Sequence, residues 1–158
     1  AEHATGQPGL RPWSRLPVLH LAGLAPRPAP PAGVQIETTL DAAAFLAAYG
    51  ADQAAQLTPA HLASPYRHHL VARLDGSVVG CARVVFLGDT ACVNAVTVPE
   101  PHRRRGIGAA LTAQASQLAR EHTDLVWLHC TDASRPLYER LGFHGVDEHV
   151  QLCDGVMA

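Results

Sequence analysis

NAVTVPEPHRRRGIGAAL, residues 94 to 111, is the stretch that decides the fold. An apolar, β-branched run is followed by a proline break, three arginines, Gly-Ile-Gly and the alanine-rich start of a helix. This order predicts a strand, a tight turn and a helix N-terminus whose first amides carry no bulky side chains. Free N–H groups and the helix dipole make such a terminus a site for an anion.

Three kinds of anion ligand compete for this turn. A P-loop requires GxxxxGK followed by Ser or Thr, and the chain contains no such run. A dinucleotide fingerprint requires GxGxxG or GxGxxA, but here Leu111 takes the last position and PEPHRRR separates the glycines from the strand. The third ligand is a diphosphate with a long pantetheine arm, for which residues 103–108 satisfy the form Arg/Gln-x-x-Gly-x-Gly/Ala.

In the third interpretation, each residue type has a physical reason. Gly106 and Gly108 let backbone amides approach two phosphates closely, and the neighbouring arginines add charge-assisted hydrogen bonds. The alternative is a helix terminus that merely packs against the sheet.

The composition bounds the class of protein. A chain of 158 residues with 47% apolar and 16% charged residues fits one globular domain. A net charge of -2 argues against a nucleic-acid binder, and no apolar run approaches the roughly 20 residues that cross a membrane. The four cysteines form no CxxC pair, which favours reduced core thiols and a cytoplasmic location.

Residues 1 to 33 are rich in proline, glycine and alanine and end in PRPAPPAG. This composition predicts an extended or polyproline-like arm or linker, with the folded domain at 34 to 158. Trp13 and the apolar run from Leu16 to Leu24 indicate that the arm docks on the domain or on the partner subunit of a homodimer. The other interpretation is a piece of a preceding domain.

Periodicity and turn residues predict the elements that follow. These are a strand at 34–38, a helix at 42–49 capped by Asp41, a short helix from Thr58 to about Ala63, strands at 70–74, 78–87 and 91–98, a helix at 106–120, a strand at 125–128, a helix at 134–141 and a strand or hairpin at 143–153. Consecutive hairpins make the first half antiparallel, and the central strand–helix–strand crossover makes one parallel pair. We therefore predict an α+β fold with a mixed, mostly antiparallel central sheet and helices on both faces.

A second motif, SRPLYERLGF at residues 134 to 143, completes a family resemblance. Together with Val96-Thr97-Val98 and the run from Arg103 to Gly108, it resembles the GNAT acetyltransferase superfamily over about residues 34 to 153. The resemblance implies a GNAT-like three-layer fold and acetyl-CoA as co-substrate. It also implies acetyl transfer to a primary amine of a small molecule or peptide, by direct attack in a ternary complex.

The resemblance also implies roles for the matching residues. The backbone of Val96 and Val98 binds pantetheine, with the Val96 amide near the thioester carbonyl, where it stabilises developing charge. Tyr138 protonates the departing thiolate, unless it only fills a gap beside Phe143. The remaining cofactor-binding residues are Arg103, Arg104, Arg105, Gly106, Ile107, Gly108, Ala109, Ser134 and Thr131, the last of which replaces the asparagine of many members.

The acceptor side has the weakest pattern. Asn94, on the same strand face as Val96, can reach the acceptor or can be a satisfied polar group at the sheet end. Conceivable bases for the acceptor amine are Glu37, His68, His69, His102 and His129, and the spacing selects none of them. The histidines match no metal-ligand spacing, so we expect no metal.

Two other functions stay open at this point. A sensor or scaffold domain can bind acyl-CoA without turning it over, and an acceptor pocket filled by the N-terminal arm would favour that alternative. The chain can also be the catalytic half of a tandem protein whose other half regulates it.

Overall fold

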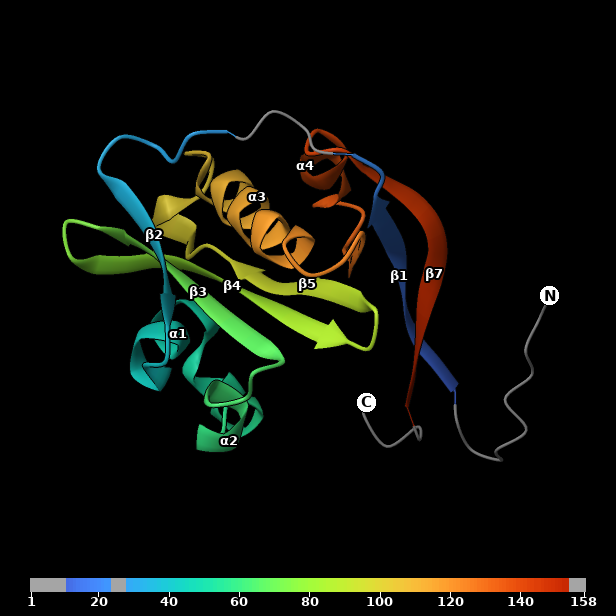
Figure 1. Cartoon of the computed structure of the whole chain (residues 1–158), viewed down its shortest axis with the longest axis horizontal. Coiled ribbons are helices and arrows are strands. Elements are labelled where there is room, and N and C mark those ends of the chain that lie inside the picture. Colours follow the sequence, from blue (N-terminus) through green and yellow to red (C-terminus); the bar gives the residue numbers. More distant parts are fainter. Residues whose placement is uncertain (1–10, 24–27, 154–158) are drawn as a thin grey trace.

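A mixed seven-stranded sheet organises the chain, whose computed structural model describes residues 11–23 and 28–153. The strands in chain order are β1 (Arg11–Leu21), β2 (Val34–Thr39), β3 (Arg67–Leu74), β4 (Ser77–Leu87), β5 (Thr90–Thr97), β6 (Leu125–His129) and β7 (Phe143–Cys153). They lie in the order β2-β3-β4-β5-β6-β1-β7 (Figure 1). All neighbouring strands are antiparallel except β5 and β6, which are parallel. The predicted α+β fold with a mostly antiparallel sheet is confirmed.

Helices cover the sheet on both faces. The helical segments are α1 (Ala42–Tyr49), η1 (Ala51–Gln56), α2 (Pro59–Leu62), η2 (Glu100–His102), α3 (Ile107–Arg120) and α4 (Arg135–Glu139). Figure 1 shows α3 and α4 on one side of the sheet and α1 and α2 on the other. The main core lies under α3, and a second cluster lies between α1, β3 and β4. Because α1 packs on β2 to β5 and α2 on β3, the two helices leave their side of β1 and β7 uncovered (Figure 1).

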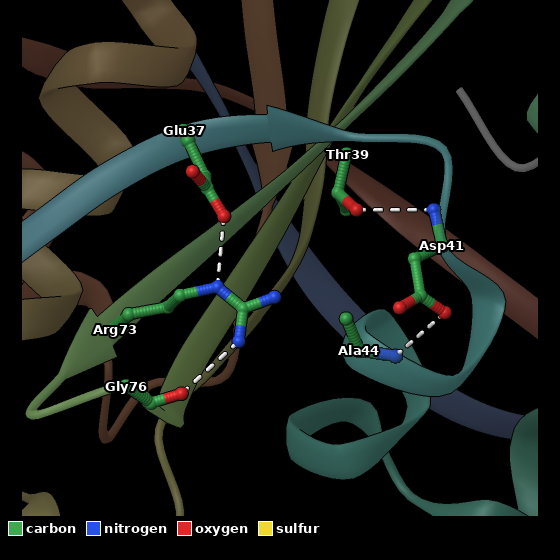
Figure 2. A network of polar contacts seen from close by, with 6 residues as sticks. All are labelled: Glu37, Thr39, Asp41, Ala44, Arg73 and Gly76. Atoms are coloured by element: carbon green, nitrogen blue, oxygen red, sulfur yellow. Dashed lines mark hydrogen bonds and ion pairs between the residues drawn. The ribbon is translucent and has the colours of Figure 1, made fainter.

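The caps of α1 and α2 agree with the sequence prediction. The Asp41 carboxylate accepts hydrogen bonds from the backbone N–H groups of Ala43 and Ala44, the second of which is drawn in Figure 2. Thr58 accepts one from the N–H of His61 and begins the short helix α2. These bonds satisfy amides that have no partner inside the helix and fix where each helix begins.

Strand β1 differs most from the sequence prediction. The prediction placed residues 1 to 33 in an arm outside a domain that begins at Val34, whereas residues 11–21 form a strand between β6 and β7. Leu19 is 0% and Leu21 is 2% exposed, so the strand contributes to the main core. The rest of the predicted arm, at residues 1–10 and 24–27, lies outside the described residues.

Prolines conceal this strand in the sequence. Proline has no N–H for a sheet ladder, so its presence counts against a strand inside a sheet. Pro17 is tolerated because it lies where β6 ends, and its carbonyl accepts a hydrogen bond of 3.1 Å from the N–H of Cys130. Pro12 lies beside a register shift in the pairing with β7. Both prolines therefore occupy positions where the regular ladder is already interrupted.

Candidate active site

The N-terminus of α3 forms a concave array of backbone N–H groups. Gly106 is its N-cap in the left-handed conformation, with φ 84°, and Arg104 is also left-handed, with φ 63°. In the described part of the chain, the N–H groups of residues 104–109 have no hydrogen-bond partner. Alternating backbone conformations of this kind point successive amides at one place and create an anion site.

Gly108 keeps space free in front of this helix terminus. A Cβ added to Gly108 would lie 3.7 Å from Val98 Cγ2 and 3.8 Å from Leu137 Cδ2, which are ordinary contacts. The protein packing therefore does not require glycine here, whereas a diphosphate that approaches the backbone closely does. The residues present thus fit the pyrophosphate of a coenzyme A thioester.

Two further features border the cradle, by which we mean residues 103–109. The Nε of Arg103 donates a hydrogen bond of 2.9 Å to the carbonyl of Val98 and ties the turn to the end of β5. Arg104 and Arg105 are exposed and form no ion pair with any described residue, so their guanidinium groups are available for phosphate oxygens. A Cβ on Gly106 would lie 3.8 Å from Cγ of Pro31, in the segment that leads into β2.

Strands β5 and β6 separate beside the cradle and leave a pocket. They pair only from Thr90 to Cys92 and from Leu125 to Trp127. Beyond these pairs, β5 is irregular: Ala95 has φ 53°, and the register with β4 shifts. The gap holds a pocket of about 220 Å³. Its lining residues are Leu16, Val93, Asn94, Ala95, Val96, His129, Cys130, Thr131, Ser134 and Tyr138.

Tyr138 brings a phenol to this pocket from α4. Its ring is buried and packs edge-on against Phe143, with centroids 6.1 Å apart. Burial, followed by the nearby Cys130, raises the pKa of Tyr138 to about 12. The phenol is therefore protonated at neutral pH and can donate its proton to an anion in the pocket.

His129 brings an imidazole to the same pocket from β6. Burial, and to a smaller extent His149, lowers the pKa of His129 below its ordinary value. Its Nδ1 is buried and has no hydrogen-bond partner in the described part of the chain. A neutral imidazole can accept a proton, and His129 is the one of the five candidate bases that lines the pocket, so the structure singles it out.

The pocket also contains the polar residues Asn94, Thr131 and Ser134. The Oδ1 of Asn94 accepts a hydrogen bond of 2.7 Å from the Nε of Arg83. The hydroxyls of Thr131 and Ser134 lie 3.0 Å apart, so part of their hydrogen-bonding capacity is used within the protein. All three line the pocket with Val96 and Tyr138. The predicted shared face of Asn94 and Val96 is wrong, because the irregularity at Ala95 turns Val96 toward the core under α3.

The other conceivable bases lie elsewhere. Glu37, on the edge strand β2, forms an ion pair of 2.8 Å with Arg73, which also donates to the carbonyl of Gly76 (Figure 2). His69 is buried against Phe45 of α1, at a centroid distance of 4.9 Å. None of the residues Glu37, His68, His69 and His102 lines the pocket.

Four lining residues were not identified as site residues from the sequence. Val93 and Ala95 belong to β5, Leu16 reaches the pocket from β1, and Cys130 follows β6 directly. The apolar residues at 16, 18, 19 and 21 are the signal in the sequence that could have revealed the strand carrying Leu16.

Comparison with known proteins identifies this arrangement. Residues 36–143, more than half of the chain, match the acetyltransferase (GNAT) family. The chain belongs to the GNAT acetyltransferase family. The resemblance inferred from the two sequence motifs is thereby confirmed.

Individual relatives agree with this assignment. The chain is similar to the N-alpha-acetyltransferase RimI of Mycobacterium tuberculosis, with 35% identity over 92 residues, covering 54% of this chain and 57% of RimI. It is similar to the structure of a GCN5-related N-acetyltransferase from Kribbella flavida, with 30% identity and a TM-score of 0.73, covering 91% of this chain and 59% of that chain. A GCN5-related N-acetyltransferase from Sphaerobacter thermophilus shares the fold at 23% identity and a TM-score of 0.70, covering 91% and 52% of the two chains. The GNAT chain thus spans less than two thirds of the length of these relatives.

Among the described residues, no helix has the length and apolarity needed to cross a membrane. Nor does that part of the chain hold a group of three or more His, Cys, Asp or Glu side chains placed to bind a metal ion.

Proposed function

We propose that this GNAT chain transfers the acetyl group of acetyl-CoA to a primary amine by direct attack in a ternary complex. The observation that carries the proposal is that Val96 of β5 and Tyr138 of α4 line one pocket, in the gap between β5 and β6. Their neighbours Val98 and Leu137 lie beside Gly108 of the cradle. The cradle and the pocket are therefore adjacent parts of one site.

The donor is bound by backbone groups for most of its length. The N–H groups of residues 104–109, with Arg104 and Arg105, bind the pyrophosphate. The pantetheine arm lies along the unpaired edge of β5, where Val96 offers backbone hydrogen bonds in the manner of an added strand. Arg103 uses one lone pair of the Val98 carbonyl oxygen. The second lone pair of that oxygen and the N–H of Val98 are left for acetyl-CoA.

The chemistry follows from the groups around the pocket. The amine nitrogen forms a bond with the thioester carbon while the carbon–sulfur bond breaks. The Val96 amide stabilises the negative charge that builds on the carbonyl oxygen. His129 takes the proton that the nitrogen loses, and Tyr138 supplies a proton to the departing thiolate. Donor and acceptor react directly, without a covalent enzyme intermediate.

Two observations favour catalysis over an acyl-CoA sensor. Leu16 of β1 forms one wall of the pocket, and a pocket of about 220 Å³ is still present beside it. Two proton-transfer groups, His129 and Tyr138, line the pocket from different elements, which binding alone does not require.

The buried free thiols of Cys81, Cys92 and Cys130 support a reducing, cytoplasmic setting.

The test combines binding with turnover. Calorimetry of the chain with acetyl-CoA should show one binding site, and a thiol reagent should detect free coenzyme A when an accepted amine is added. Peptides with a free N-terminus are the first acceptors to test, because the similar RimI protein is named an N-alpha-acetyltransferase. Binding without coenzyme A release from a broad amine panel would favour the sensor, and no binding would overturn the proposal.

A further inference from the structure

Arg83 is a half-buried cation beside the pocket, on β4. Its Nε donates to the Oδ1 of Asn94, and its guanidinium carbon lies 5.8 Å from the ring centroid of Tyr49 in α1. The described residues provide no carboxylate for it. The four arginines that do form ion pairs in this part of the chain are Arg15, Arg73, Arg120 and Arg135. Arg83 is therefore held in place at its Nε and over an aromatic ring while its charge stays unbalanced.

The neighbour of Arg83 on β3 does not offset its charge. The buried His69 lies opposite it in the pairing of β3 with β4. Burial, followed in order by Arg83, Arg67, His68 and His61, lowers the pKa of His69 to about 4. No carboxylate acts in the opposite direction. A half-buried guanidinium with no anion beside it is costly to desolvate, and an anionic ligand offsets that cost.

Strand register places Arg83 on the acceptor side of the pocket. Arg83 pairs with Asn94, and Cys92 pairs with Trp127 in the parallel ladder. Because side chains alternate along a strand, Asn94 and His129, each two residues further on, point to the same face as Cys92 and Trp127. Because Arg83 contacts Tyr49 of α1, this shared face is the face of the sheet that carries α1. The cradle belongs to α3 on the opposite face, so the amine approaches from the side of Arg83 and His129.

We propose that Arg83 binds a carboxylate of the acceptor, so that the substrate is an amine with an acidic group nearby. This inference rests on the acetyl transfer proposed above. Asn94 occupies the Nε and acts as a positioning residue, which leaves the two η nitrogens to bind the carboxylate as a fork. Neighbouring strands lie about 4.8 Å apart, so the bound carboxylate holds an amine a few bonds away at the gap beside β5.

The carboxylate can come from two sources with the same chemistry: the α-carboxylate of a free amino acid, or an acidic side chain at the N-terminus of a peptide. Matched pairs of acceptors separate them. Alanine is compared with alaninamide, and a tetrapeptide that begins with glutamate is compared with one that begins with glutamine. Turnover is read as coenzyme A release, and acetyl-CoA affinity is measured by calorimetry.

Two variants test Arg83 itself, and a third serves as the control. Arg83→Gln should raise KM for the preferred carboxylate acceptor about 10- to 100-fold, the range expected for a lost charge-assisted bond, with unchanged acetyl-CoA affinity. Arg83→Lys should recover part of the loss because it restores the charge without the fork. Arg73→Gln is the matched control. Arg73 on β3 is already paired with Glu37, so this substitution should leave the acceptor preference unchanged.

The outcomes separate this inference from the proposed function. A preference for the carboxylate member of either pair that disappears in Arg83→Gln supports the inference and identifies the source. If amides react as well as acids, or if Arg83→Gln keeps the preference, the carboxylate site is overturned while acetyl transfer stands. A failure of every amine to release coenzyme A overturns both.

Discussion

The imidazole of His129 stacks on that of His149, with ring centroids 5.4 Å apart and planes 22° from parallel. His129 comes from β6 and His149 from β7, so strand β1 lies between the strands that carry the two rings. The stack shields His129 from water and places a second titratable group beside it. Both effects disfavour the protonated imidazole.

We expect His149→Ala to move the pH profile of acetyl transfer. His129 must be neutral to accept the amine proton, so kcat/KM should fall as the pH falls through its pKa, which lies below 6.5. Removing His149 uncovers His129 and removes a nearby positive charge, so the acidic limb should shift upward toward pH 6.5. A profile that does not move would show that His149 does not act on the base.

His129→Gln tests the base directly. A positioned general base contributes roughly 10²- to 10⁴-fold, so kcat should fall within that range and the acidic limb should disappear. Acetyl-CoA affinity should stay near the wild-type value because the cradle lies on the other face of the sheet. Wild-type kcat in this variant would assign proton removal to solvent or to another residue.

Tyr138→Phe should reduce turnover more than donor affinity. The phenyl ring retains the packing against Phe143, so the melting temperature should hold, while the thiolate loses its proton donor. We expect kcat to fall at least about 10-fold, with the calorimetric affinity for acetyl-CoA nearly unchanged. Equal turnover would make Tyr138 a packing residue.

Gly108→Val should abolish acetyl-CoA binding without unfolding the chain. The added Cβ meets Val98 and Leu137 at ordinary contact distances, while the branched side chain takes up space that the pyrophosphate needs beside the backbone. Gly23→Val is the control, because a Cβ at Gly23 meets no atom within 4 Å. Calorimetry should show no binding for the first variant and full binding for the second, and thermal melting should be similar for both. Retained affinity in Gly108→Val would exclude the cradle as the phosphate site.

His69 should make the fold sensitive to acid. Its pKa is about 4 in the folded chain and 6.5 ordinarily, so the unfolded chain binds the proton first. The neutral His69 therefore contributes roughly 3 kcal/mol to the free energy of unfolding. This contribution is present above pH 6.5 and is lost as the pH falls toward 4. Both ring nitrogens lack a partner among the described residues, so His69→Leu should keep neutral-pH stability and flatten this decline in urea denaturation. An unchanged decline would assign the acid sensitivity to other groups.

The geometry of the proposed donor half follows from the sequence, whereas that of the proposed acceptor half does not, for a physical reason. The cradle is local: Arg103 to Gly108 lie within one turn, and their spacing alone determines which amides point outward. The acceptor side is assembled by strand register, which brings Arg83, Asn94 and His129 to one face from three separate strands. No spacing along the chain contains that information, and the sheet order that determines it depends on long-range pairing.

Strand β1 shows the same limit and gives the last prediction. Its prolines conceal the alternation of buried leucines, so only pairing with β6 and β7 reveals it as part of the sheet. Leu19→Ala should therefore cost about 3 kcal/mol of unfolding free energy, whereas Trp13→Ala, at a side chain 63% exposed, should cost under about 1. Deleting residues 1 to 21 should leave the facing edges of β6 and β7 unpaired and abolish cooperative melting. A truncated chain that melts at the wild-type temperature would show that β1 is an appendage, and that the sheet is complete without it.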